Sequence, residues 1–372
     1  MDSNKGKAKV QMDAEATIKG TAAGKGVTHQ ERKSKKRVAA TKKKADEPIV
    51  RKMMDSTVKV TRRPAPEYKL TSPVFEEDRS EFNGMWMQTW GDLIKSMDEK
   101  TTIRSVRYAD VDSPEVPAGP IDTLQFFEVK ISEISGLKWP LQVYGFVAAR
   151  DMVDYKRNMI FERERDNCQI ISEEFPYLTL TGPARAVVLV DPVYFEVDLR
   201  VKGTGQSEDQ ELIFIASSFR NIHPLDSSIF KCVYTSNIST LELTFGHIIR
   251  SVEASVSMKV INGSWPDGFR GSFAARTASI NDMSIGLVYI GDNFKLPLAD
   301  DGEIKLHRHV VCAEIKDGEH LEVSVSAFGL DGQLLEDGLY FTPQKRGKLK
   351  GTLNVSSCEI EVTVTWSLIR WC

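Results

Sequence analysis

The chain has 372 residues, 41% of them hydrophobic and 27% charged, which is the composition of a soluble globular protein with one large or two small domains. Its five cysteines are widely spaced and form no CxxC pair, which excludes a zinc site of that type and argues against a secreted disulfide framework. No apolar run approaches the roughly 18 residues needed to span a bilayer. We therefore expect a nuclear or cytoplasmic protein with no membrane segment.

The net charge of −3 conceals a division between a basic and an acidic part. The first 70 residues hold 19 Lys and Arg against 8 Asp and Glu, whereas the remaining 302 hold 30 against 44, so the two parts carry +11 and −14. Tyr68 is the only aromatic residue in the first part. Such a segment buries too little apolar surface to offset roughly 1–2 kcal/mol of backbone entropy per residue. We predict that residues 1–70 form a disordered basic arm.

Two basic clusters separated by four residues stand out in this arm. Their members are Lys33, Lys35, Lys36, Arg37, Lys42, Lys43 and Lys44. They resemble a bipartite nuclear import signal, and they also suit weak, sequence-independent contact with nucleic-acid phosphate. A third interpretation is a solvated tail with neither role. No aromatic residue is interleaved with the basic ones, so base stacking is not expected.

Residues 71–100 are predicted to be a linker followed by one short amphipathic helix. Apolar side chains recur at helical spacing from about Met85 to Met97, with Asn83 as the expected N-cap. The stripe consists of Trp86, Trp90, Leu93, Ile94 and Met97. We expect this helix to dock on the body, the alternative being a partner-binding surface.

From residue 101 to residue 372 the pattern predicts a β-rich domain. Apolar and polar side chains alternate over 195–201, 321–327 and 358–368, which is typical of antiparallel sheet with one face on a core. The fold class is therefore all-β, mainly an antiparallel β-sandwich. The Asp317-Gly318 pair between the stretches 304–315 and 319–328 predicts a hairpin.

Three short blocks recur at one offset of 126 residues. They are 145–150 and 271–276, 178–180 and 304–306, and 195–199 and 321–325. Either the body consists of two duplicated halves, 101–245 and 246–372, or strands that share an alternating pattern match by coincidence.

The sequence gives only weak indications of catalytic or metal sites. His307 and His309 lie two apart in a presumed strand without a third ligand, and we expect them to be surface histidines flanking Arg308. The mixed-charge run 161–166 is expected to be a salt-bridged wet face. No phosphate-binding loop, GxGxxG or GxSxG motif occurs. We therefore predict no catalytic residue, no cofactor-binding residue and no metal ligand.

Several strings of the body resemble plant proteins of domain-of-unknown-function family 6598, over roughly residues 100–370. They lie at 143–151, 157–158, 165–169, 180–183, 252–254, 268–277 and 361–368. The resemblance implies a β-rich fold, found mainly in grasses, without a settled activity. It also implies a link by domain fusion to ribosome-inactivating rRNA N-glycosidases, whose catalytic helix carries a Glu followed three residues later by an Arg.

In this chain the residue three positions after Glu253 is Val256 and not an arginine. The local alternation also predicts a strand and not a helix, so Glu253 receives no catalytic role. The leading hypothesis is a non-catalytic, β-rich interaction module that binds an unknown protein or glycan partner. The alternatives are an enzyme related to those N-glycosidases and a carbohydrate-binding sandwich.

Overall fold

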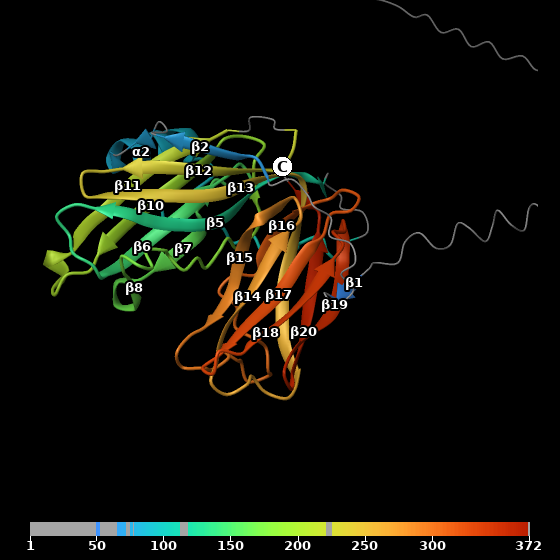
Figure 1. Cartoon of the computed structure of the whole chain (residues 1–372). Helices are drawn as coiled ribbons and strands as arrows, with labels where there is room; N and C mark the ends of the chain where they lie inside the picture. Colours follow the sequence, from blue (N-terminus) through green and yellow to red (C-terminus); the bar gives the residue numbers. More distant parts are fainter. Residues whose placement is uncertain are drawn as a thin grey trace, which may run out of the picture. The chain divides into compact units, whose positions relative to one another are not determined.

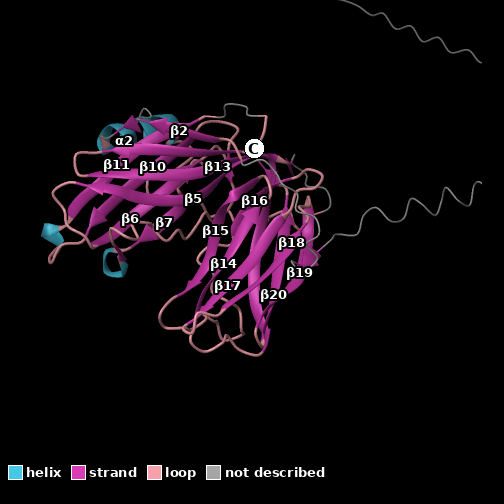
Figure 2. Ribbon diagram, in the orientation of Figure 1, coloured by secondary structure: helices cyan, strands magenta, loops and turns pink. Residues whose placement is uncertain are grey.

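The computed structural model describes residues 50–52, 65–71, 75–76, 78–111, 118–220 and 225–370. The fold is mostly β, with 56% strand and 6% helix, which confirms the predicted class of antiparallel sheets with one helix (Figures 1 and 2). The seven basic arm residues from Lys33 to Lys44 lie outside the described residues. Within those residues, no helix combines the length and apolar character that crossing a membrane requires.

The strands form two smaller sheets on either side of one large sheet. The six-stranded sheet contains β3 (Phe75–Glu76), β11 (Gln210–Phe219), β10 (Val193–Val201), β6 (Leu141–Arg150), β7 (Asn158–Arg163) and β8 (Gln169–Ile171). The five-stranded sheet contains β1 (Val50–Lys52), β18 (Leu334–Phe341), β17 (Leu321–Gly329), β14 (Phe269–Thr277) and β15 (Ile280–Ile290). The eight-stranded sheet contains β19 (Arg346–Val355), β20 (Cys358–Ser367), β13 (Ser239–Asn262), β12 (Ser228–Thr235), β2 (Glu67–Thr71), β16 (Val310–Glu314), β5 (Ile121–Ile134) and β9 (Val187–Val188). β21 (Ile369–Arg370) pairs with β4 (Ala118–Gly119).

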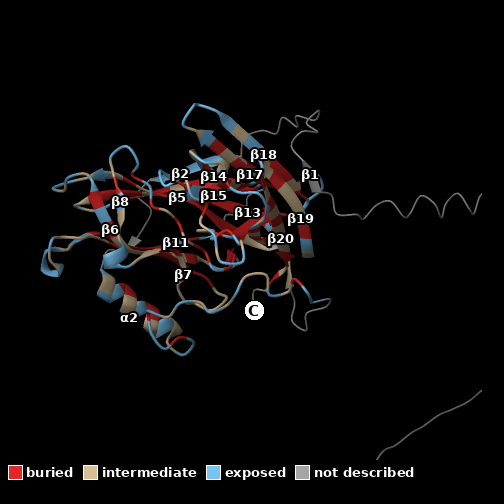
Figure 3. Cartoon of the chain, turned by 90° about the horizontal axis from the view of Figure 1, so that it is seen from below, coloured by how far each residue is buried: buried red, intermediate tan, exposed pale blue. Residues whose placement is uncertain are grey.

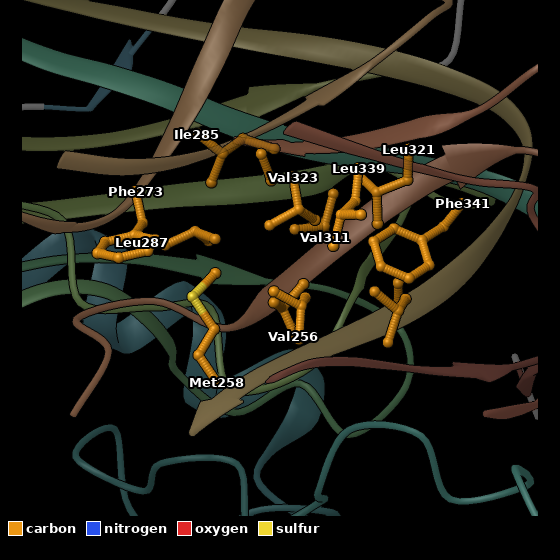
Figure 4. Close-up of a cluster of buried hydrophobic side chains, with 14 of the residues drawn as sticks. Val256, Met258, Phe273, Ile285, Leu287, Val311, Leu321, Val323, Leu339 and Phe341 are labelled. Carbon is orange, nitrogen blue, oxygen red and sulfur yellow. The ribbon is translucent and has the colours of Figure 1, made fainter. Parts of the chain in front are cut away.

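Two hydrophobic cores divide the body into two sandwiches. The first core lies between the six-stranded sheet and β5, β12 and the beginning of β13. The second lies between the five-stranded sheet and the end of β13 with β16, β19 and β20. Figure 3 shows the buried residues along the strands of both parts, and Figure 4 shows side chains of the second core meeting from opposite sheets, Val256 from β13 and Phe273 from β14 among them. Each sandwich buries enough apolar surface for a core of its own.

The two sandwiches have the same strand order. The first runs β7-β6-β10-β11 over β9-β5-β13-β12, and the second runs β15-β14-β17-β18 over β16-β13-β20-β19. Loop hydrogen bonds recur as well. Leu178 N donates to Val129 O at 2.9 Å, and Ile304 N, 126 residues later, donates to Met258 O at 2.8 Å. The two sandwiches thus share a strand order, while the acceptors Val129 and Met258 lie 129 residues apart, and duplication stays a prediction.

Strand β13 belongs to both sandwiches. Its first part pairs with β5 and β12, and its last part pairs with β16 and β20. The register shifts between Ile248 and Ser251, where Arg250 adopts a φ of +43° and its N–H donates to Asp122 Oδ1 at 3.0 Å. The boundary suggested between residues 245 and 246 falls inside this strand, a few residues before the register shift.

Burial alternates along the strands that the sequence pattern predicted, but the hairpin predicted at Asp317-Gly318 is wrong. In β20 the buried residues are Cys358, Ile360, Val362, Val364 and Trp366. The Asp317-Gly318 turn joins two sheets instead, because β16 pairs with β13 while β17 pairs with β14 and β18. All five residues of β16 are buried, which is typical of a strand covered on both faces.

Within the described residues, the predicted helix is shorter and begins earlier than expected. α2 spans Arg79–Trp90 and is capped by Asp78, whose carboxylate accepts from the N–H of Ser80 at 2.8 Å and of Glu81 at 3.0 Å. Asn83 is therefore inside the helix, and the apolar residues from Leu93 to Met97 lie in the turns that follow.

The predicted docking of the helix is confirmed. Phe82 and Trp86 are buried against Phe214 and Ala216 of β11, and Trp86 meets Tyr194 edge to face at 5.0 Å between ring centroids. The helix thus covers the outer face of the six-stranded sheet, which the alternation had assigned to solvent.

Beneath the helix lies a buried ionic cluster that we call the Glu196 cluster: Glu196, Arg150 and Arg157. Arg150 Nε donates to Glu196 Oε2 at 2.7 Å, and Arg157 Nη2 donates to Oε1 at 2.6 Å. Arg150 Nη2 also donates to Met97 O at 2.6 Å, and Arg157 Nη1 to Asp98 Oδ1 at 2.7 Å. The cluster ties the segment after the helix to the sheet.

Two of the described strands, β1 and most of β2, lie in the first 70 residues, where no fold was expected. β1 pairs with β18 in the second sandwich, and β2 runs parallel to β12 in the first, with the Tyr68 ring stacked on Phe230 at 5.2 Å. Both add a strand to a sheet edge that the body already provides, which explains why a segment with few apolar residues is ordered at these positions.

Candidate functional site

A shallow hollow of about 280 Å³ lies where the two sandwiches meet. It is bordered by the segment after α2, by the approach to β9, by Glu253 of β13 and by the chain after β20. We call it the arginine hollow; its charged and polar members are Arg104, Arg107, Tyr108, Arg185, Glu253 and Arg370. These residues come from four distant parts of the chain, and the fold brings them together.

Glu253 forms the buried side of the hollow. Its carboxylate oxygens accept hydrogen bonds from the main-chain N–H groups of Val106 and Ala186. Burial raises the pKa of Glu253, although these two hydrogen bonds and the charges of Arg185 and Arg107 act in the opposite direction. Val106 adopts a φ of +49°, which is rare for a β-branched residue, so the contact with Glu253 holds a strained backbone in place.

Arg185 is the one arginine of the hollow that is neutralised by carboxylates. Its Nη1 and Nη2 donate to the two oxygens of Asp151 at 2.7 and 2.8 Å, and Nη2 also donates to Asp154 Oδ1 at 3.0 Å. Burial disfavours its charge, but these ion pairs outweigh burial and raise the pKa of Arg185. Asp151 also accepts from Val188 N at 2.8 Å, so the pair anchors the approach to β9.

Arg104, Arg107 and Arg370 differ from Arg185. Among the described residues, none of the three has a carboxylate within 4.0 Å. Arg104 and Arg107 are exposed, and the Arg107 guanidinium lies 5.5 Å from the centre of the Tyr108 ring. Arg370 is half-buried, and its Nε is enclosed without a hydrogen-bond partner in the described part of the chain. The hollow therefore presents uncompensated positive charge.

The histidines singled out in the sequence do not form a site. His307 and His309 lie in the loop before β16 rather than in a strand, and burial lowers the pKa of both. Arg308 between them is buried and donates to Gly182 O at 2.9 Å and to Phe126 O at 2.6 Å. Among the described residues, no group of three or more His, Cys, Asp or Glu is arranged to hold a metal ion.

The mixed-charge run 161–166 makes its short ion pairs with distant residues, whereas Arg165 and Asp166 inside the run lie 3.9 Å apart. Glu162 pairs with Lys100 at 2.6 Å, and Arg165 Nε donates to Asp209 Oδ2 at 2.7 Å. Asp209 also accepts from the Tyr144 hydroxyl at 2.7 Å and from Gly203 N at 2.8 Å. The Arg165 hydrogen bond, with these two, holds the pKa of Asp209 well below its ordinary value against the effect of burial.

This low pKa predicts a specific response to acid. Because the folded-state pKa of Asp209 lies below its unfolded value, its contribution to stability is present above the unfolded pKa and is lost as the pH falls. Asp209→Asn should therefore flatten the decrease in the urea midpoint between about pH 6 and pH 2. Asp92→Asn, at an exposed position, is the control and should leave the wild-type slope. Equal slopes for all three proteins would contradict the prediction.

Three of the cysteines, Cys232, Cys312 and Cys358, are buried and protected from reaction. Burial raises the pKa of Cys232 to about 11 and that of Cys312 to about 12, and it also raises the pKa of Cys358. Thiolates are the reactive form, so iodoacetamide should label half-buried Cys168 and spare these three in the native protein. The test is peptide mass mapping after labelling with and without urea, in a variant with Cys372→Ser. Labelling of Cys312 without urea would contradict the assignment.

No pattern in the sequence indicated the arginine hollow. Arg104 and Arg107 lie in an irregular segment of turns without periodicity, and Arg370 lies close to the end of the chain. One feature of the sequence could have indicated that these arginines lack ion-pair partners. Neither Arg104 nor Arg107 has an acidic residue within two positions, unlike the arginines of 161–166.

Two solved proteins and one family model match parts of this chain. Human GIVD cytosolic phospholipase A2 matches 68% of this chain at 8% identity with a TM-score of 0.23, and the chain spans 31% of that protein. The paired C2 domains of Extended-Synaptotagmin 2 match 73% of this chain at 9% identity with a TM-score of 0.24, over 100% of that chain. No curated protein matches. The family model "Domain of unknown function (DUF6598)" matches residues 123–364, which include most of both sandwiches, and the chain belongs to this family.

Proposed function

We propose that the protein is a non-catalytic interaction module that contacts an acidic protein partner through the arginine hollow. The observation that carries the proposal is the convergence of Arg104, Arg107 and Arg370 without ion-pair partners among the described residues. The hollow is a positive region on a body whose residues from 71 onward carry a formal charge of −14. The positive hollow attracts an acidic surface, while the negative remainder of the body repels it.

The groups around the hollow support binding rather than catalysis. Both oxygens of Glu253 are engaged by main-chain N–H groups, and both oxygens of Asp151 are engaged by Arg185. A general acid or base needs a carboxyl within hydrogen-bond reach of a substrate. These carboxyls hold the segments that border the hollow instead.

Charge reversal tests the proposal. The full-length tagged protein and its Arg104→Glu/Arg107→Glu variant are incubated with an extract of the producing cells at about 0.15 M salt, and the bound proteins are quantified by mass spectrometry. We expect the specific partner to be recovered at least roughly tenfold less with the variant, because opposite charges at the hollow become like charges.

The matched control reverses two positive charges elsewhere. Arg220→Glu/Lys305→Glu changes exposed residues that do not border the hollow. Recovery should be unchanged in this control. Equal recovery by both double variants would remove the hollow from the proposal.

The enzyme hypothesis is tested separately. Glu253 lies in strand β13 with Val256 three residues later, and its carboxyl is buried, which opposes a role like that of the glutamate in rRNA N-glycosidases. The purified protein at high concentration should release no adenine from ribosomes. Release above that of heat-inactivated protein would contradict the non-catalytic proposal, and a specific signal on a glycan array would favour the carbohydrate-binding alternative.

We further propose that the basic clusters from Lys33 to Lys44 serve nuclear import or weak contact with nucleic acid. The support is their composition and spacing alone. Removing residues 1–47 retains the strands β1 and β2, so the body should remain folded while nuclear accumulation is lost. An unchanged location of the shortened protein would dismiss import, and unchanged, salt-independent RNA binding would dismiss nucleic-acid contact by the arm.

A further inference from the structure

The ligand chemistry of the arginine hollow follows from its donors. Each guanidinium is a planar fork of N–H donors that suits the oxygens of a carboxylate or a phosphate. Arg104, Arg107 and Arg370 all line the hollow, and none of the three has a carboxylate within 4.0 Å among the described residues. A bound anion would supply the counter-charge that Asp151 and Asp154 supply for Arg185.

The charge of the cluster favours phosphate over carboxylate. Arg104, Arg107 and Arg370 carry three positive charges, whereas Arg185 is already paired with Asp151 and Asp154. A carboxylate brings one negative charge and two oxygens. A phosphate monoester brings roughly −1.5 to −2 and three acceptor oxygens, so it matches three guanidinium groups more closely.

The size of the hollow favours one terminal group over a whole metabolite. Its volume of about 280 Å³ includes open solvent, and the space left for the centres of water-sized molecules is only about 20 Å³, so the hollow is too small to enclose a small molecule. The buried wall carries Glu253, whose oxygens are both occupied, together with apolar Ala186 and Val188. A compact head group thus fits at the surface while the molecule that carries it remains outside.

We propose that the arginine hollow binds a phosphate monoester group carried by a protein partner, that is, a phosphorylated side chain. This inference rests on the proposed function, since it names the chemical group that the interaction module recognises. Arg104 and Arg107 bind the outward oxygens, and Arg370 binds from the side of β21.

A direct binding measurement tests whether the hollow recognises a phosphate monoester. The full-length protein is titrated with three fluorescent peptide pools. The first is phosphorylated at a central Ser, Thr or Tyr, the second is the same pool without phosphate, and the third carries Glu at that position. Inorganic phosphate serves as the competitor. We expect binding of the phosphorylated pools alone, competition by phosphate at higher concentration, and affinity lower by roughly tenfold or more in Arg104→Ala/Arg107→Ala.

The controls separate recognition from general charge and from misfolding. Arg220→Ala/Lys305→Ala should bind as wild type, and Arg104→Lys/Arg107→Lys should lose part of the affinity because lysine lacks the planar fork. The melting temperatures of all variants should agree with wild type, since the substituted side chains are exposed. Equal affinity for phosphorylated and Glu-containing pools, or an equal loss in the control variant, would overturn the inference.

Phosphatase treatment of the extract separates this inference from the proposed function. If recovery of the partner depends on Arg104 and Arg107 and is lost after phosphatase treatment, both stand. If it depends on these arginines but survives treatment, the interaction module stands and the phosphate inference falls. Binding of inorganic phosphate or phosphatidic acid vesicles without binding of any phosphopeptide also overturns it.

Discussion

Replacing Glu196 with Ala should lower the free energy of unfolding by about 3–5 kcal/mol, the range observed when one partner of a buried ion pair is removed. The side chains of Arg150 and Glu196 are 0% and 2% exposed, and Arg157 is 11% exposed. Without the carboxylate, the fully buried Arg150 keeps main-chain acceptors but has no counter-charge. Urea denaturation at neutral pH, followed by tryptophan fluorescence, measures the change.

The comparison for this prediction is an ion pair at the surface. Glu162→Ala removes the pair with Lys100, whose side chains are 39% and 54% exposed, and should cost at most about 1 kcal/mol. Glu196→Gln should cost less than Glu196→Ala, because the amide oxygen still accepts from one arginine. If Glu196→Ala and Glu162→Ala had the same effect, the Glu196 cluster would not anchor the segment after the helix.

Replacing Phe245 with Ala should cost about 3–5 kcal/mol through the cavity that it leaves. Phe245 is fully buried in β13, and its ring lies between 4.9 and 5.9 Å from those of Phe126, Phe195, Phe219 and Phe230. Aromatic pairs of this kind add to the stability beyond the apolar area that they bury. Thermal and urea unfolding should both show the loss.

Phe328→Ala is the matched control, because the same side chain is 53% exposed near the end of β17. Its effect should stay within about 0.5 kcal/mol. A loss for Phe245→Ala close to that of the control would mean that the aromatic cluster rearranges to fill the space.

Burial alternation predicted the β class because side chains on a strand point to opposite faces. The prediction succeeded for β20, where one face meets the core, and it misplaced Glu196, because α2 covers the face assigned to solvent. Alternation records which face is buried, but not what lies on the other side. It also cannot tell a hairpin from a crossover, which is why the turn at Asp317-Gly318 was misassigned.

The helix boundary and the arginine hollow show two other limits. The apolar stripe from Trp86 to Met97 continues past the helix because the turns also bury Ile94 and Met97, so spacing extended the helix beyond its end. The hollow unites Arg104, Arg185 and Arg370 through topology alone. No local pattern connects residues so far apart, and without that contact each arginine resembles an ordinary surface charge.

The length of β13 prevents the chain from being divided into two independently folding halves. A strand of 24 residues extends about 80 Å when straight, far more than either sandwich needs for its own pairing. Cutting it anywhere leaves one fragment with an unpaired hydrogen-bonding edge, which promotes aggregation. Neither sandwich is therefore a self-contained unit, and expression of an isolated sandwich should give insoluble material where the intact chain folds.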